Sequence, residues 1–205
     1  MSLWGDTTIL LASKSPRRRQ LVEMLGIPFK IVDISVDETL DHPVEASLVA
    51  QSLAALKADG YDKPLSPNEI LLTADTTVVL NNSVLGKPRS REEAFAMLSA
   101  LSGHTHEVYT GVCLKTNRTK KVFSECTKVV FRPLSDEAIN YYIDNYNCMD
   151  KAGAYGIQEW IGLYGVERIE GCYYNVMGLP VARICREIAE LGIRNGQLTI
   201  DNFTP

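Results

Sequence analysis

Three consecutive arginines follow two serines and a proline in the string SKSPRRR, residues 13–19. Ser15 followed by Pro16 predicts a helix start, because serine caps free amides and proline is tolerated at the first helical position. The arginines then occupy the positive end of the helix dipole, where each exposed cation costs roughly 0.3–1 kcal/mol. A phosphate bound there would meet backbone amides, the hydroxyls of Ser13 and Ser15 and two guanidinium groups. The alternative is a solvated basic helix start that pairs with nearby carboxylates.

Helical spacing separates the three arginines. Leu21 and Val22 belong to the apolar face of this helix, and Arg17 and Arg18 lie four residues before them. Arg19 falls nearer the solvent side. We therefore expect Arg17 and Arg18, rather than Arg19, to face a bound anion.

Two carboxylates have the positions expected of functional groups. Asp75 interrupts the apolar and threonine-rich string LLTADTTVV, and burying a lone carboxylate is costly without a cation, a metal or several donors. Glu38 follows a predicted strand, and together the two acids could hold Mg²⁺ or Mn²⁺. The alternatives are a strand-end aspartate bonded to local amides and a solvated loop glutamate. Thr76 is expected on the opposite face from Asp75 if the strand continues.

Two lysines are further candidates. Lys57 closes a predicted helix on its apolar row, so it either reaches out from a buried face or simply pairs with the helix dipole. Lys87, in the string LGKP, lies in a loop where sequence does not separate it from a solvated lysine. His104 and His106 lack a third ligand at zinc-like spacing, which argues against a zinc site.

Alternating and helical apolar patterns predict a mixed α/β protein built on a substantial sheet. Strands are expected over residues 7–13, 29–34, 69–80, 106–116, 120–132 and 160–169. Helices are expected over 16–25, 43–58, 90–101, 135–146 and 180–191, and Asn81-Asn82 predicts a hairpin turn. We expect a single domain over residues 1–205.

Composition restricts the partners and the compartment. With 205 residues and a net charge of −4, the chain has no global attraction for a nucleic-acid polymer or an anionic membrane. Its five cysteines are widely spaced, which favours reduced thiols. The N-terminus has no signal-peptide pattern. We therefore expect a cytoplasmic protein without a membrane anchor, and a small anionic ligand.

Together these strings resemble the Maf-type nucleoside triphosphate pyrophosphatases, a family also described as septum-formation inhibitors. The matching strings occur in family order and cover roughly residues 9–191: LASKSPRR, VDE, LLTADT, LGKP, SGHTHEVYTGV, DKAGAYGIQ and YYNVMGLP. The resemblance implies an elongated, twisted mixed sheet flanked by helices, with two lobes and a central cleft, similar to the inosine triphosphate pyrophosphatase fold. It also suggests a homodimer.

The resemblance implies cleavage between the α and β phosphates of a nucleoside triphosphate, with a divalent cation, Mg²⁺ or Mn²⁺. Asp75 corresponds to the family's proton acceptor. The string DKAGAYGIQ resembles the branch that acts on dTTP and UTP, in which Arg17, Thr76 and Gln158 are the specificity positions. Lys151 of the same string is expected at the substrate.

The residue chemistry is compatible with this activity. Arg17 and Arg18 would bind the phosphates and Lys57 and Lys87 would neutralise further charge. Glu38 with Asp75 would hold the metal, and Asp75 would also orient or deprotonate the attacking water.

Gln158 offers an amide donor beside an acceptor, which matches the N3–H and carbonyl edge of uracil or thymine. A flipped amide matches cytosine, so neighbouring groups must hold the amide one way round. Modified pyrimidine nucleotides are further candidate substrates. Two other functions remain open at this point: a nucleotide-sensing regulator of cell division and septum formation, and a pyrophosphatase that prefers 7-methyl-GTP.

Overall fold

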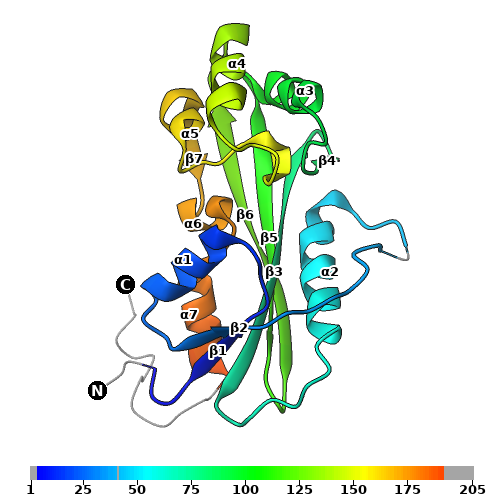
Figure 1. Cartoon of the computed structure of the whole chain (residues 1–205), viewed down its shortest axis with the longest axis vertical. Coiled ribbons are helices and arrows are strands. Elements are labelled where there is room, and N and C mark those ends of the chain that lie inside the picture. The colour runs from blue at the N-terminus through cyan, green and yellow to red at the C-terminus, as the bar shows by residue number, and fades with distance from the viewer. Residues whose placement is uncertain (1–3, 41, 192–205) are drawn as a thin grey trace.

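A mixed sheet of seven strands organises the residues that the computed structural model describes, 4–40 and 42–191 (Figure 1). The strands are β1 (Thr8–Leu11), β2 (Phe29–Ile31), β3 (Glu69–Leu80), β4 (Ser83–Leu85), β5 (Thr105–Lys115), β6 (Lys120–Phe131) and β7 (Val166–Glu170). Their order is β2-β1-β3-β5-β6-β7, and β4 also pairs with β3. Strand β1 runs parallel to β2 and β3, and the other pairs are antiparallel. The mixed α/β fold predicted from the sequence is confirmed.

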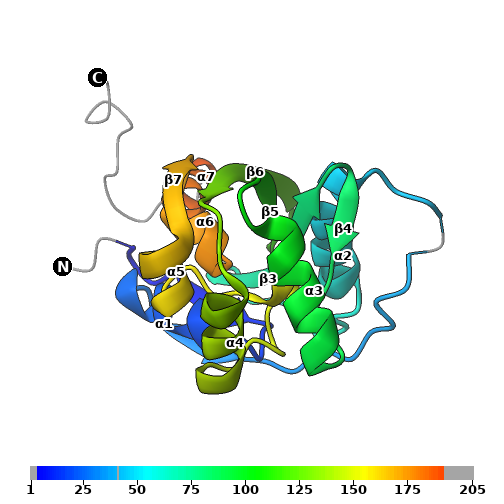
Figure 2. The same ribbon diagram turned by 90° about the horizontal axis from the view of Figure 1, so that it is seen from above.

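The long central strands give the molecule its elongated shape. Strand β3 has 12 residues, so at 3.3 Å per residue it extends over roughly 40 Å. Helices cover both faces of the sheet (Figures 1 and 2). They are α1 (Pro16–Met24), α2 (Ala46–Asp59), α3 (Arg91–Leu101), α4 (Asp136–Asn145), α5 (Trp160–Gly165), α6 (Tyr173–Met177) and α7 (Val181–Glu190), with a 3-10 turn η1 (Ala152–Ala154).

Alternation along β1 divides the core into two parts. Ile9 and Leu11 pack into the larger cluster, which also contains Leu21 of α1 and Ile184 of α7. Leu10 points the other way, into a smaller cluster under α2. Because side chains alternate along every strand, residues next to each other in β3 must also face different helices.

Helix α2 lies unusually close to the sheet. The residues that face the strands, Ala50, Ala54 and Ala58, are small and fully buried. Gly111 of β5 lies beneath them, and a Cβ at this position would come within 2.2 Å of the Ala50 carbonyl oxygen. This close approach sets α2 against β3 and β5, so that the Lys57 side chain, from the last turn of α2, reaches Asp75 at the middle of β3.

The edge of β3 is open over a short stretch. Pairing with β1 ends at Leu72, and pairing with β4 begins only at Val78. Strand β2 ends at Ile31, and the chain then leaves the sheet and runs toward α2 (Figure 1). Side chains from both faces of β3 can therefore reach one opening at this edge.

Most predicted elements agree with the structure. Asn81 and Asn82 form the predicted turn, with φ values of 50° and 61°, the left-handed conformations that tight hairpin turns require. The strand predicted over 160–169 is wrong in its first half, where residues 160–165 form α5. Trp160 and Tyr164 stack at 4.5 Å between ring centroids, a contact that one helical turn permits and an extended strand does not.

The domain predicted over residues 1–205 includes residues 1–3, 41 and 192–205, which lie outside the described part of the chain, so it stays a prediction. Within the described ranges, the helices lack the combination of length and apolar character needed to span a bilayer.

Candidate active site

A cleft of about 490 Å³ opens at the unpaired edge of β3. It is within the size range of pockets that take small-molecule ligands, roughly 300–1,000 Å³. Its walls come from the turn before α1, residues 32–38, the end of α2, the 150–158 segment and the turn after α6. Every site residue predicted from the sequence lines this cleft: Ser13, Ser15, Arg17, Arg18, Glu38, Lys57, Asp75, Thr76, Lys87, Lys151 and Gln158.

The two serines shape the start of α1. The Ser15 hydroxyl accepts a hydrogen bond from the Arg18 amide at 3.4 Å, and the Ser13 hydroxyl accepts one from the Ser15 amide at 3.2 Å. Each hydroxyl still has its own proton to donate. The start of α1 therefore presents two hydroxyl donors at the positive end of the helix dipole.

Arg18 ties three segments of the cleft together. Its guanidinium donates to the Gly178 carbonyl at 2.8 Å, to the Ala74 carbonyl at 2.7 Å and to the Thr76 hydroxyl at 2.9 Å. Burial lowers the pKa of Arg18 from its ordinary value. Three of the five guanidinium donors are thus used in holding the cleft wall, and two remain for a ligand.

Arg17 and Arg19 have different surroundings. Arg17 is largely buried and forms an ion pair with Asp150 at 3.2 Å. Arg19 is exposed. The separation of Arg19 from its two neighbours, expected from helical spacing, is confirmed.

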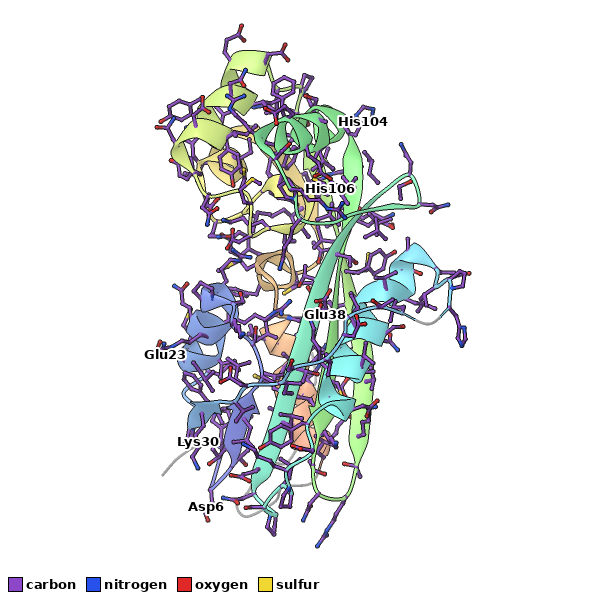
Figure 3. All side chains as sticks on the ribbon, turned by 45° about the vertical axis from the view of Figure 1, so that its right-hand side comes forward. Asp6, Glu23, Lys30, Glu38, His104 and His106 are labelled. Carbon is purple, nitrogen blue, oxygen red and sulfur yellow. The ribbon has the colours of Figure 1, made fainter. Side chains whose placement is uncertain are left out.

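Two carboxylates converge on one ammonium group. Lys57 of α2 lies 2.7 Å from Asp75 and 3.0 Å from Glu38. Asp75 and Lys57 have side chains that are only 18% and 16% exposed, whereas Glu38 is 55% exposed. Figure 3 shows Glu38 beside α2, at the middle of the sheet. Two acids from different segments thus face one cation.

Thr76 faces away from Asp75, as expected for a continuous strand. Its hydroxyl lies 3.0 Å from the Thr110 hydroxyl and accepts from Arg18. Asp75 points to Lys57 of α2, and Thr76 points to Arg18 of α1. Both nevertheless line the cleft, because the edge of β3 is unpaired between Leu72 and Val78.

The upper wall of the cleft is the segment 150–158. Lys151 is 5% exposed, and its ammonium group contacts the Asp150 and Glu159 carboxylates at 2.8 and 2.9 Å and donates to the Asn147 carbonyl. Gln158 is exposed at the cleft.

The loop of Lys87 is joined to this segment. Lys87 itself is exposed at the cleft. The Gly153 amide donates to the Gly86 carbonyl at 3.0 Å, so one backbone hydrogen bond connects the loop to the wall that carries Gln158.

Sequence reasoning did not identify Asp150, Glu159 or Tyr142. Tyr142 donates to Glu159 and accepts from the Gly156 amide at 3.0 Å. Burial raises the pKa of Asp150, but its contacts with Lys151 and Arg17 outweigh burial and lower it overall. The acid beside Lys151 in the string DK was the local signal for this network, since Tyr142 lies on α4 and Glu159 directly precedes α5.

The histidines lie apart from this cleft. His106 is buried against Phe131 and Tyr155, and burial lowers its pKa to about 4 (Figure 3). Within residues 4–40 and 42–191, no group of three or more His, Cys, Asp or Glu side chains is arranged to hold a metal ion.

A divalent cation nevertheless fits the donors present. Mg²⁺ prefers oxygen ligands and is commonly held by one or two carboxylates together with substrate phosphates and water. Glu38 and Asp75 supply two such carboxylates, and they already share one cationic group, the Lys57 ammonium.

Comparison with known proteins gives consistent matches over nearly the whole chain. A family model described as Maf-like protein matches residues 8–191. The chain is 46% identical over 184 residues to a dTTP/UTP pyrophosphatase of Bacteroides thetaiotaomicron, covering 89% of this chain and 95% of that protein. It is 49% identical over 181 residues to a dTTP/UTP pyrophosphatase of Parabacteroides distasonis, covering 88% and 94%. The resemblance inferred from the motifs is confirmed.

Proposed function

Because the chain belongs to the family of Maf-like proteins, we propose that it hydrolyses dTTP and UTP to the nucleoside monophosphate and pyrophosphate. One observation carries the chemistry. The Lys57 ammonium group lies 2.7 Å from Asp75 and 3.0 Å from Glu38, in the same cleft as the start of α1. A carboxylate, a cation and a phosphate-binding helix start are the groups that cleavage of a phosphoanhydride bond needs.

The triphosphate would bind at the start of α1. The hydroxyls of Ser13 and Ser15 would donate to phosphate oxygens, and Arg17 would exchange part of its pairing with Asp150 for a phosphate. Lys87 would contact the same phosphate groups from its loop. The two unused donors of Arg18 would complete this phosphate-binding site.

Asp75 is the proposed proton acceptor. Its carboxylate is held at 2.7 Å by Lys57, which keeps one oxygen fixed and leaves the other for a water molecule. Glu38 and Asp75 would hold the divalent cation, Mg²⁺ or Mn²⁺, which when bound supplies charge stabilisation to the phosphates and the leaving pyrophosphate.

Substrate selectivity would come from Gln158 on the opposite wall together with residues of α1 and β3. Gln158 would read the N3–H and carbonyl edge of uracil or thymine, with Arg17 and Thr76 as the other specificity positions. Lys151, a predicted substrate-binding residue, belongs to this wall, where its ammonium group is engaged by Asp150, Glu159 and the Asn147 carbonyl. Modified pyrimidine nucleotides with the same edge would also be accepted.

The net charge of −4 supports a small anionic substrate rather than a nucleic-acid polymer or an anionic membrane. A cytoplasmic location and a homodimer stay predictions.

A panel of triphosphates tests this function. With Mg²⁺, the purified protein should release pyrophosphate from dTTP and UTP faster than from CTP and 7-methyl-GTP. Faster turnover of 7-methyl-GTP would instead identify a purine enzyme. If cells lacking the protein regain normal septation with an inactive Asp75→Asn variant, its cellular role would be that of a nucleotide sensor.

A further inference from the structure

Three side chains converge on Gly156 in the wall that carries Gln158. A Cβ added at Gly156 would lie 2.8 Å from Lys151 Cε, 2.9 Å from Glu159 Cδ and 3.0 Å from Gln158 Nε2. The missing side chain therefore leaves a space that the amide nitrogen of Gln158 and the largely buried Lys151–Glu159 ion pair border together. This is the neighbourhood that must decide which way round the amide is held.

The ion pair itself is held rigidly. Lys151 Nζ contacts Glu159 Oε1 at 2.9 Å and Asp150 Oδ1 at 2.8 Å, and it donates to the Asn147 carbonyl. An ammonium group has three donors, so these partners use all of them. Since Lys151 is almost completely buried, leaving any of these contacts unmade would be costly, and the group has one stable position.

Tyr142 fixes the second oxygen of Glu159. Its hydroxyl donates to Glu159 Oε2 and accepts from the Gly156 amide at 3.0 Å. Burial, followed by the contact with Glu159, raises the pKa of Tyr142, so it remains a donor near neutral pH. Both carboxylate oxygens thus have defined partners, and the carboxylate cannot rotate freely.

The negative charge of Glu159 favours one of the two orientations of the neighbouring Gln158 amide. The nitrogen end of a glutamine amide carries two N–H donors and the oxygen end accepts. A carboxylate attracts the nitrogen end and repels the oxygen end. In the structure the nitrogen end of Gln158 is the one that lies over Gly156.

We infer that Glu159 and Lys151 are specificity-determining positioning residues, which hold the Gln158 amide in one orientation and so separate uracil and thymine from cytosine. The inference rests on the proposed function for its ligand. Uracil and thymine present a donor beside a carbonyl, whereas cytosine presents an acceptor beside an amino group. An amide held one way matches only one of these orders, and an amide free to turn by about 180° matches both.

Binding selectivity in the Glu159→Gln variant tests the inference. This change keeps the shape of the side chain and removes its negative charge. The positive charge of Lys151 then dominates near the Gln158 amide, and it favours the flipped orientation, with the oxygen end inward. Glu167→Gln is the matched control, because Glu167 is an exposed glutamate on β7. The probes are the α,β-methylene analogues of UTP and CTP, which resist cleavage, and their affinities are measured by calorimetry with Mg²⁺.

The wild-type protein should bind the UTP analogue at least about tenfold more tightly than the CTP analogue, which corresponds to about 1.4 kcal/mol. Glu159→Gln should reduce this ratio at least about tenfold, mainly through weaker uridine and stronger cytidine binding. Glu167→Gln should leave the ratio unchanged. Pyrophosphate, which has no base, should bind equally to the wild type and to both variants.

An unchanged ratio in folded Glu159→Gln protein would overturn the inference, and so would equal binding of both analogues by the wild type. If Glu159→Gln fails to fold, Tyr142→Phe decides the question, because it frees one oxygen of Glu159 and should shift the ratio in the same direction. A wild-type protein that prefers the UTP analogue but releases no pyrophosphate from UTP would refute the proposed function and leave this inference standing.

Discussion

Replacement of each of the three arginines by methionine should give three different outcomes, although the residues are consecutive. Arg18→Met removes a partly buried guanidinium that donates to two carbonyls and one hydroxyl. Hydrogen bonds to charged groups contribute about 1.5–3 kcal/mol each, and bonds in one network do not add fully, so we expect a loss of about 3–5 kcal/mol in the free energy of unfolding.

Arg17→Met removes one partly exposed ion pair with Asp150. Such pairs contribute about 0.2–1 kcal/mol, so the protein should keep its stability and lose its phosphate ligand. Arg19→Met changes an exposed side chain and should affect neither property.

Thermal unfolding and dTTP turnover together separate these cases. For a chain of this size about 1 kcal/mol shifts the melting temperature by about 2–4 °C, so Arg18→Met should melt about 6–20 °C lower than the wild type. Arg17→Met should melt within about 4 °C of the wild type and still lose most of its turnover. If Arg18→Met melts as high as Arg17→Met, the role assigned to Arg18 is wrong.

Further variants and conditions test other parts of the account. Gly111→Ala places a Cβ against the Ala50 carbonyl, so it should lower the free energy of unfolding, measured in urea, by about 3 kcal/mol and reduce turnover by displacing Lys57. The control Gly86→Ala, where the added Cβ has open space, should keep wild-type stability. Equal stability of the two variants would refute this. Burial holds His106 neutral, with a pKa of about 4 in the folded protein against 6.5 in the unfolded chain. Its contribution to stability is therefore present above pH 6.5 and falls by about 3 kcal/mol as the pH drops toward 4. His106→Gln should flatten this part of the pH dependence of unfolding, and an unchanged slope would contradict the assignment. Chelation by EDTA should abolish dTTP turnover and added Mg²⁺ or Mn²⁺ should restore it, whereas full activity in EDTA would exclude the metal role proposed for Glu38 and Asp75.

The sequence was most informative where a residue conflicted with its local pattern. Asp75 in an apolar strand and the arginines at a helix start are both costly without a partner, so each indicated a functional position. Helical spacing was sufficient to separate Arg19 from Arg17 and Arg18, because that spacing is local.

Features that depend on strand order could not be predicted in the same way. The open edge of β3 exists because β1 ends opposite Leu72 and β4 begins opposite Val78, and no local pattern records which strands are neighbours. The contact between Tyr142 and Glu159 joins residues 17 positions apart on different elements. The strand predicted over 160–169 was wrong in its first half, where Trp160 and Tyr164 stack one helical turn apart, because β propensity depends on tertiary context that a local pattern does not contain.

The products formed from dTTP test the central claim most directly. Wild-type protein with Mg²⁺ should convert each dTTP to one dTMP and one pyrophosphate, separated by anion-exchange chromatography, and Asp75→Asn should lose nearly all of this turnover while keeping its fold. Formation of dTDP and orthophosphate, or undiminished turnover in Asp75→Asn, would contradict the account.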